Sequence, residues 1–241
     1  MSRLTLLRNE DPPEDFPDPG QALTSPNGLL ALGGDLSPQR LLAAYRRGIF
    51  PWYEDGQPIM WWSPDPRAVL LPGDLHLSRS LRRTLRSGRY TVSVDHDFAG
   101  VIDACAQTRA MQGTWITADM RSAYRQLHEL GHAHSMETWL GERLVGGIYG
   151  IAIGKVFFGE SMFSTESDAS KVALAALMQE ISRRDFGLLD CQIETPHLNS
   201  LGSRLMNRRD FISAVSRLTA TTEQGCNWRS GPYPSKELVA R

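Results

Sequence analysis

The chain has few cysteines, no long apolar run and almost no net charge. Its cysteines, Cys105, Cys191 and Cys226, are widely spaced and form no CxxC pair, which argues against a disulfide framework and a zinc knuckle. No segment approaches the roughly 20 apolar residues that a membrane helix needs. The first residues turn acidic and proline-rich before a signal peptide could form. We therefore expect a cytoplasmic protein without a membrane partner.

A formal net charge of −1 argues against bulk attraction to nucleic acid, but residues 78–88 are locally basic. Ser78 is a typical N-cap and Gly88 a typical helix end. In the helix expected between them, four arginines fall within an arc of roughly 100°, opposite two leucines. A solvated helix face usually mixes both signs of charge, so this acid-free face indicates phosphate binding. The four are Arg79, Arg82, Arg83 and Arg86.

The order of predicted elements indicates an α/β (α+β) protein with a mostly antiparallel central sheet. We expect a small N-terminal α/β unit, residues 1–65, followed by a larger domain, residues 66–241. The proline-rich residues 58–72 predict an irregular junction between them. Predicted helices span 37–47, 78–88, 98–108, 117–130, 169–184 and 211–218, and predicted strands span 4–7, 90–94, 135–140, 143–153, 155–159 and 188–194.

Glu160 is a lone carboxylate between aromatic and apolar neighbours, next to Gly159 and just before a helix that we expect to be capped. Such a carboxylate either has a buried partner or meets a substrate. On the strand 188–194, a period of two places Asp190 and Gln192 on one face. These two polar side chains need partners, which are either each other or a substrate.

Seven blocks of the sequence resemble the leucyl/phenylalanyl-tRNA–protein transferase family, in the family's order and from about Pro26 to Phe211. They are residues 26–37 (PNGLLALGGDLS), 48–53 (GIFPWY), 61–67 (WWSPDPR), 113–117 (GTWIT), 146–150 (GGIYG), 157–171 (FFGESMFSTESDASK) and 190–192 (DCQ). The resemblance implies an acetyltransferase-like (GNAT-like) main domain. It also implies transfer of Leu, Phe and less readily Met from aminoacyl-tRNA to proteins with an N-terminal Lys or Arg, which marks them for degradation. Conversion of an ester to an amide needs no cofactor and no metal, and a monomer is the default expectation.

The resemblance also assigns substrate-binding residues. An apolar pocket for the aminoacyl side chain comprises Ile148, Leu174, Leu177, Ile181 and Leu189. Trp52 and Trp115 are expected to bind the tRNA 3′ end, with the acceptor stem along the four arginines. Simple core packing is the alternative for each pocket residue and for both tryptophans.

We expect Asp190, Gln192 and Glu160 to form the reacting centre. Gln192 offers a donor and an acceptor with which to hold the ester, Asp190 can orient it, and Glu160 can hold the aminoacyl-adenosine end. A buried Asp–Gln pair that only fixes the strand is the alternative. The proton acceptor stays open, as does the group that meets the basic N-terminal residue, for which Asp65, Glu160 and Glu166 are candidates.

Three other interpretations fit the sequence less well. Residues 128–132 (HELGH) match the HExxH zinc motif, but Gly131 indicates that the helix ends before the second histidine. A CoA-dependent N-acyltransferase would need a pyrophosphate-binding R-x-x-G-x-G/A segment, which no segment completes. A non-catalytic tRNA-binding protein would use exposed tryptophans, Trp61 and Trp62 among them, for stacking, but would leave Glu160, Asp190 and Gln192 without a role.

Overall fold

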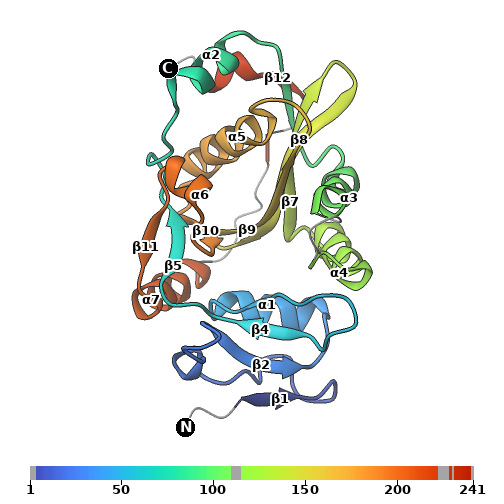
Figure 1. The fold of residues 1–241 in the computed structure, drawn as a ribbon, viewed down its shortest axis with the longest axis vertical. Coiled ribbons are helices and arrows are strands. Elements are labelled where there is room, and N and C mark those ends of the chain that lie inside the picture. The colour runs from blue at the N-terminus through green and yellow to red at the C-terminus, as the bar shows by residue number, and fades with distance from the viewer. Residues whose placement is uncertain (1–3, 110–114, 222–227, 230, 240–241) are drawn as a thin grey trace.

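The structure is a computed structural model that describes residues 4–109, 115–221, 228–229 and 231–239. Gly113, Thr114 and Cys226, named above, lie outside these residues. Within the described ranges the strands form a four-stranded and an eight-stranded sheet. The two sheets lie one after the other along the long axis of the molecule (Figure 1). The mixed α/β class with mostly antiparallel pairing is confirmed.

The smaller sheet belongs to the N-terminal part of the chain. Its strands are, in spatial order, β1 (Thr5–Leu7), β2 (Leu29–Gly33), β4 (Met60–Trp62) and β3 (Phe50–Pro51). Helix α1 (Pro38–Arg46) begins as predicted, because Ser37 Oγ accepts the Arg40 N–H, and it is followed by Gly48 with a φ of 71°.

The proline-rich junction is more ordered than predicted. Residues 58–72 contain β4 and β5 (Arg67–Leu70), a strand of the larger sheet, instead of an irregular link. The expected exposure of Trp61 and Trp62 is wrong, because both are buried. Their indole N–H groups donate to the carbonyls of Gly33 and Trp52 at 2.8 and 2.7 Å. These tryptophans therefore hold the smaller sheet together.

The larger sheet carries the rest of the chain. In spatial order its strands are β11 (Arg204–Met206), β5 (Arg67–Leu70), β10 (Leu188–Gln192), β9 (Val156–Ser164), β8 (Arg143–Ile153), β7 (Ala133–Leu140), β6 (Thr91–Val94) and β12 (Tyr233–Pro234). The meander β7–β8–β9 is antiparallel, and β10 pairs with β9 in parallel. Helix α5 (Ala169–Arg183) makes the crossover between β9 and β10. This meander–helix–parallel strand order is the acetyltransferase-like arrangement expected for the main domain.

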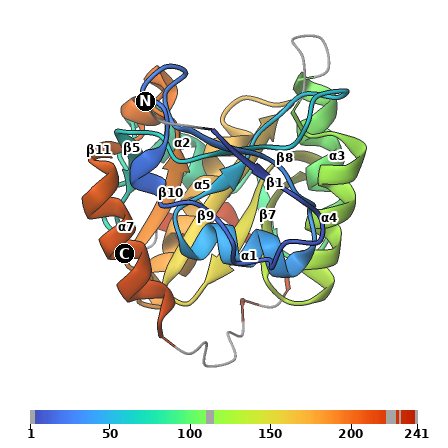
Figure 2. The same cartoon turned by 90° about the horizontal axis from the view of Figure 1, so that it is seen from below.

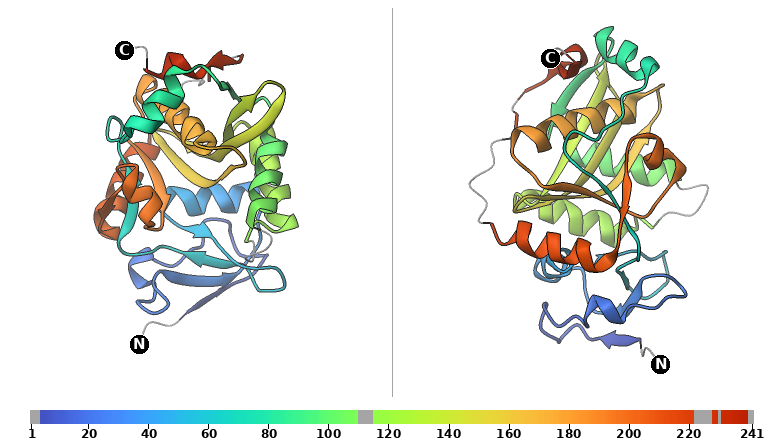
Figure 3. Two further views of the ribbon diagram at one scale, coloured as in Figure 1. Left: turned by 45° about the horizontal axis from the view of Figure 1, so that its top comes forward. Right: turned by 90° about the vertical axis from the view of Figure 1, so that its left-hand side faces the viewer.

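Helices cover both faces of the larger sheet (Figure 2). Helix α5 packs on one face, and α3 (Phe98–Arg109) and α4 (Ala118–Glu129) pack on the other. Helix α7 (Arg208–Thr219) lies beside α1, where the two sheets meet (Figure 3). A short helix, α6 (Pro196–Ser200), follows β10 and was not predicted. Among the described helices, none is both long and apolar enough to cross a bilayer.

The start of α5 differs from the predicted cap. Asp168 has a left-handed backbone with a φ of 64° and makes no side-chain cap bond. The Ser170 N–H instead donates to Ser164 Oγ at 3.1 Å, so the end of β9 caps the helix. The Asp168 carboxylate accepts from Thr84 Oγ1, on helix α2 (Arg79–Arg86), and from Lys171 Nζ, each at 3.0 Å. Helix α2 is thereby fastened to α5.

Candidate active site

A cavity of about 340 Å³ opens between β3 of the smaller sheet and strands β9 and β10 of the larger one. It brings together the three residues of the predicted reacting centre, both tryptophans and part of the predicted pocket. These are Glu160, Asp190, Gln192, Trp52, Trp115, Ile148, Leu174 and Leu189. Residues far apart in the sequence therefore meet in one cavity with a polar end and an apolar end.

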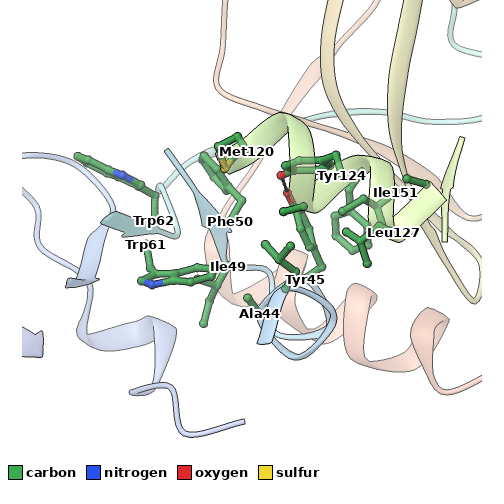
Figure 4. Close-up of a cluster of buried hydrophobic side chains, with 14 of the residues drawn as sticks. Ala44, Tyr45, Ile49, Phe50, Trp61, Trp62, Met120, Tyr124, Leu127 and Ile151 are labelled. Atoms are coloured by element: carbon green, nitrogen blue, oxygen red, sulfur yellow. Dashed lines mark hydrogen bonds between the residues drawn. The ribbon is translucent and has the colours of Figure 1, made fainter. Parts of the chain in front are cut away.

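Glu160 lies at the polar end, in an irregularity where β9 loses register with β8. Its side chain is buried, and three described side chains donate to its carboxylate. Tyr45 Oη and Gln192 Nε2 donate to Oε1 at 2.7 and 2.9 Å, and Tyr124 Oη donates to Oε2 at 2.9 Å. Figure 4 shows Tyr45 on α1 and Tyr124 on α4 pointing toward one another, with their hydroxyl oxygens within hydrogen-bond distance. The two hydroxyls have two protons for three contacts, so all three bonds form together only when Glu160 is protonated and donates one. The smaller sheet's helix thus contributes directly to the site.

The protonation of Glu160 is set by opposing effects. Burial raises the pKa of Glu160 to about 7, against the hydrogen bonds from Tyr45 and Tyr124, which stabilise the charged form. The nearby charge of Asp190 contributes to this rise in the pKa, and the charge of Arg67 opposes it. A carboxyl group with this pKa is present in both protonation states near neutral pH, which suits proton transfer.

Asp190 is bonded to an arginine that was not predicted to belong to the site. Arg67 on β5 donates from Nε to Asp190 Oδ1 at 2.8 Å and from Nη2 to Oδ2 at 2.7 Å. Both side chains are completely buried. The expected Asp–Gln side-chain contact is therefore replaced by an Arg–Asp pair, and Gln192 uses its side chain on Glu160 instead.

Gln192 reaches Glu160 through an irregular backbone. Strand β10 ends at Gln192, short of the predicted residue 194, and its pairing with β5 shifts between Asp190 and Gln192. Gln192 has a φ of 63°, in the left-handed region, and its N–H donates to Asp190 Oδ1 at 2.9 Å. The regular strand predicted for residues 188–194 is therefore wrong at Gln192, although Asp190 and Gln192 both line the cavity as expected.

The apolar end holds three of the five predicted pocket residues, namely Ile148, Leu174 and Leu189. Met162 and Leu198, which were not predicted, also line it. Leu177 and Ile181 are outside the described lining: they are fully buried in the same hydrophobic cluster, behind the cavity wall. The helical spacing correctly placed them on one face of α5, but only the first of the three residues on that face reaches the cavity.

The predicted tRNA-binding residues lie in two places. Trp52 is 40% exposed and Trp115 is partly buried, and both line the cavity. The four arginines are exposed on α2, outside the described lining. Helix α5 connects the two places, because its N-terminal end contacts α2 while Leu174 lines the cavity.

The HExxH segment is not a continuous helix. Helix α4 ends at Glu129, so the second histidine lies beyond it, as predicted. Within the described part of the chain, no group of three or more His, Cys, Asp or Glu side chains is placed to hold a metal ion.

Arg67, Tyr45 and Tyr124 are the residues that sequence reasoning missed. Arg67 ends the block at residues 61–67 and opens an apolar strand, and Asp190 is likewise the only charged residue of its strand. Two lone opposite charges on buried strands are a signal that pairing could have used. The tyrosines give no such signal, because neither lies in a distinctive pattern.

The fold is of the acetyltransferase-like class, and the cavity places an apolar recess beside groups suited to move a proton. Family models place it more narrowly: the model described as "Leucyl/phenylalanyl-tRNA protein transferase" matches residues 69–216, and that of the family's N-terminal domain matches residues 34–65. The chain belongs to this family and is an aminoacyltransferase.

Individual relatives agree over almost the whole chain. A leucyl/phenylalanyl-tRNA–protein transferase of Azoarcus sp. (strain BH72) is 57% identical over 222 residues, which cover 92% of this chain and 91% of the relative. One of Xylella fastidiosa (strain M23) is 55% identical over 243 residues, covering 99% of this chain and 100% of the relative. Among solved structures, L-PGS from Bacillus licheniformis aligns with a TM-score of 0.42 and 9% identity, over 80% of this chain and 73% of that one.

Proposed function

We propose that the protein transfers Leu, Phe and less readily Met from aminoacyl-tRNA to the N-terminal Lys or Arg of acceptor proteins. The new N-terminal residue marks the acceptor for N-degron-dependent degradation. The observation that carries this proposal is the cavity itself, in which an apolar recess leads directly to the Glu160–Gln192 hydrogen bond. The protein acts in the cytoplasm as a monomer, without cofactor or metal. Its chain divides into a small N-terminal domain, residues 1–65, and an aminoacyl-transfer domain, residues 66–241.

The aminoacyl-tRNA enters with its side chain in the recess. Ile148, Leu174 and Leu189 contact that side chain, and Leu177 and Ile181 support the wall from behind. The terminal base stacks on Trp52 or Trp115, which is worth roughly 1–3 kcal/mol per base. The acceptor stem follows the arginines of α2, whose phosphate contacts carry no sequence information. Recognition therefore depends on the amino acid rather than on the tRNA sequence.

In the reaction, the acceptor's α-amine attacks the ester carbonyl. A bond forms between the amine nitrogen and the carbonyl carbon, and the bond between that carbon and the ribose oxygen breaks. The amine loses one proton, and the ribose oxygen leaves as a hydroxyl with one proton gained. Gln192 holds the ester through its amide, and Asp190 holds the backbone of Gln192. Glu160 lies within hydrogen-bond distance of the Gln192 amide and has a pKa near neutrality, so it can hold a proton during the transfer. Positioning of the two substrates supplies much of the remaining acceleration.

The test is incubation of the native protein with labelled Leu-tRNA and a protein that begins with Arg, followed by sequencing of the product's N-terminus. We expect Leu followed by Arg. The matched control is the same acceptor with its first residue changed to Ser, which should remain unlabelled. Absence of label on both acceptors, with intact Leu-tRNA present throughout, rejects the proposed function.

A further inference from the structure

Arg67 is a fully buried arginine that is not among the described residues lining the cavity. Two of its nitrogens bind the two oxygens of Asp190, and a third, Nη1, donates to the Gly48 carbonyl at 3.1 Å. The guanidinium also lies over the rings of Phe50 and Phe211, 4.7 and 4.5 Å from their centroids. Its orientation is thus determined by five contacts from three parts of the chain.

These contacts continue from Arg67 to the reacting centre. Asp190 Oδ1, which binds Arg67 Nε, also accepts the Gln192 N–H at 2.9 Å. Gln192 has a left-handed backbone, which a residue other than glycine keeps only when its surroundings hold it there. The side-chain amide of Gln192 donates to Glu160 Oε1. The position of the Gln192 side chain therefore depends on a carboxylate that Arg67 holds.

We propose that Arg67 is a positioning residue for aminoacyl transfer, which acts through Asp190 to aim the Gln192 amide at the reacting ester. The proposal rests on the proposed function. It gives the segment after α1 a part in the reaction, because Gly48 and Phe50 of that segment hold Arg67, while Tyr45 on α1 holds Glu160. The N-terminal unit then braces both carboxylates of the site.

Only an arginine fits this position. Its planar fork matches both oxygens of a carboxylate at once and stacks between aromatic rings, whereas a lysine ammonium binds as a point charge. The pair is also hard to explain by stability alone, because replacing a buried ion pair by apolar residues is often neutral or stabilising. A role in orientation accounts for the bidentate geometry.

The test compares Arg67→Lys with Arg40→Lys. Arg40 is a matched control because it is also fully buried, pairs with Asp35 at 3.1 Å and donates to the Arg8, Asp11 and Pro12 carbonyls, away from the cavity. For both variants, the measurements are the thermal midpoint, kcat and KM for Leu-tRNA in the transfer assay, and hydrogen exchange of the Gln192 backbone N–H.

We expect both variants to melt earlier than the native protein, and only Arg67→Lys to lose kcat, by about tenfold to about hundredfold, with KM for Leu-tRNA unchanged. Hydrogen exchange at the Gln192 backbone N–H should accelerate in Arg67→Lys alone. Equal kcat values for the two variants, or unchanged exchange at Gln192, overturn the proposal. If the native protein transfers nothing, the proposed function fails by itself, and the exchange rates then decide whether Arg67 holds Gln192.

Phe211→Leu is the second variant, for the case in which Arg67→Lys does not fold. It removes one ring from the guanidinium and no hydrogen bond. We expect a fall in kcat of a few-fold and faster exchange at Gln192, at unchanged KM. Native values of both quantities in this variant reject the role of Arg67.

Discussion

In the cavity, the carboxylates of Glu160 and Asp190 are buried, and donors from three different helices and strands, together with Gln192, hold them in place. Along α2, the four arginines stand in solvent, and within the described ranges none of them is in an ion pair. Burying the two carboxylates costs free energy, and the hydrogen bonds that offset this cost also fix their geometry. Charge on α2 is screened and free to follow a flexible polyanion. We infer that the cavity determines the rate of transfer and α2 the strength of tRNA binding.

The largest expected effect is at Gln192. Gln192→Ala removes the amide that donates to Glu160 while leaving the Arg67–Asp190 pair intact. We expect kcat to fall about 10²–10³-fold, as when one preorganised donor is removed from an active site, with KM for Leu-tRNA nearly unchanged. Steady-state kinetics measure both values. Gln126→Ala on the exposed side of α4 is the control and should match the native protein. A native kcat in Gln192→Ala would show that the reacting centre lies elsewhere.

The second effect separates the wall of the recess from the core behind it. Leu174→Trp puts a larger side chain into the lining, and we expect transfer of Leu and Phe to fall about tenfold to hundredfold. Leu177→Ala removes a buried side chain outside the lining, so it should cost about 2–5 kcal/mol of unfolding free energy. The preference of the Leu177→Ala variant for Leu over Phe should change much less than that of the Leu174→Trp variant. Competition between Leu-tRNA and Phe-tRNA measures that preference, and a reversed outcome for the two variants would place the substrate side chain elsewhere.

The third effect concerns the arginine helix. Arg79→Gln combined with Arg83→Gln should weaken tRNA binding and flatten the slope of log affinity against log salt by about 2. At saturating tRNA, kcat should remain native, because neither residue belongs to the described lining of the cavity. The control pair is Arg209→Gln with Arg217→Gln on the exposed side of α7. Salt slopes that are the same in both double variants contradict a tRNA path along α2.

The smallest effect is a shift in pH dependence. Tyr45→Phe removes a hydrogen bond that stabilises the charged form of Glu160, so the pKa of Glu160 should rise above its value of about 7. If Glu160 must be charged to take up the proton, the acidic limb of the kcat profile moves upward by about half to one pH unit. Tyr90→Phe loses a partly buried hydrogen bond from its hydroxyl to the Ser167 carbonyl and serves as the control. An unmoved limb in Tyr45→Phe assigns that limb to the substrate amine.

Sequence reasoning reached the residues that lie in long, regular elements or in distinctive blocks. The arginine face of α2 and the first residues of α1 follow from helix periodicity and capping, which are local properties. A period of two placed Asp190 and Gln192 on one face of a strand, Glu160 was expected to join them in the reacting centre, and the structure brings all three into one cavity. Strands β2, β4 and β5 were not predicted. The edge strands β3, β11 and β12 were missed too, because two or three residues are too few to show a period.

The missing part of the site consists of contacts between distant residues. Tyr45 is 115 positions from Glu160, and Arg67 is 123 positions from Asp190. Periodicity describes neighbours in the chain and gives no information on such pairs. The left-handed backbone of Gln192 was equally hidden, because it results from the Asp190 hydrogen bond and the loss of strand register rather than from its own residue type.

The most direct measurement is single-turnover transfer of leucine from Leu-tRNA to a peptide that begins with Arg, at enzyme concentrations that bind all the tRNA. The account predicts a native rate for Arg79→Gln/Arg83→Gln and a rate about 10²–10³-fold lower for Gln192→Ala. A native rate for Gln192→Ala together with a slow α2 variant would contradict the assignment of chemistry to the cavity and of tRNA binding to the arginine helix.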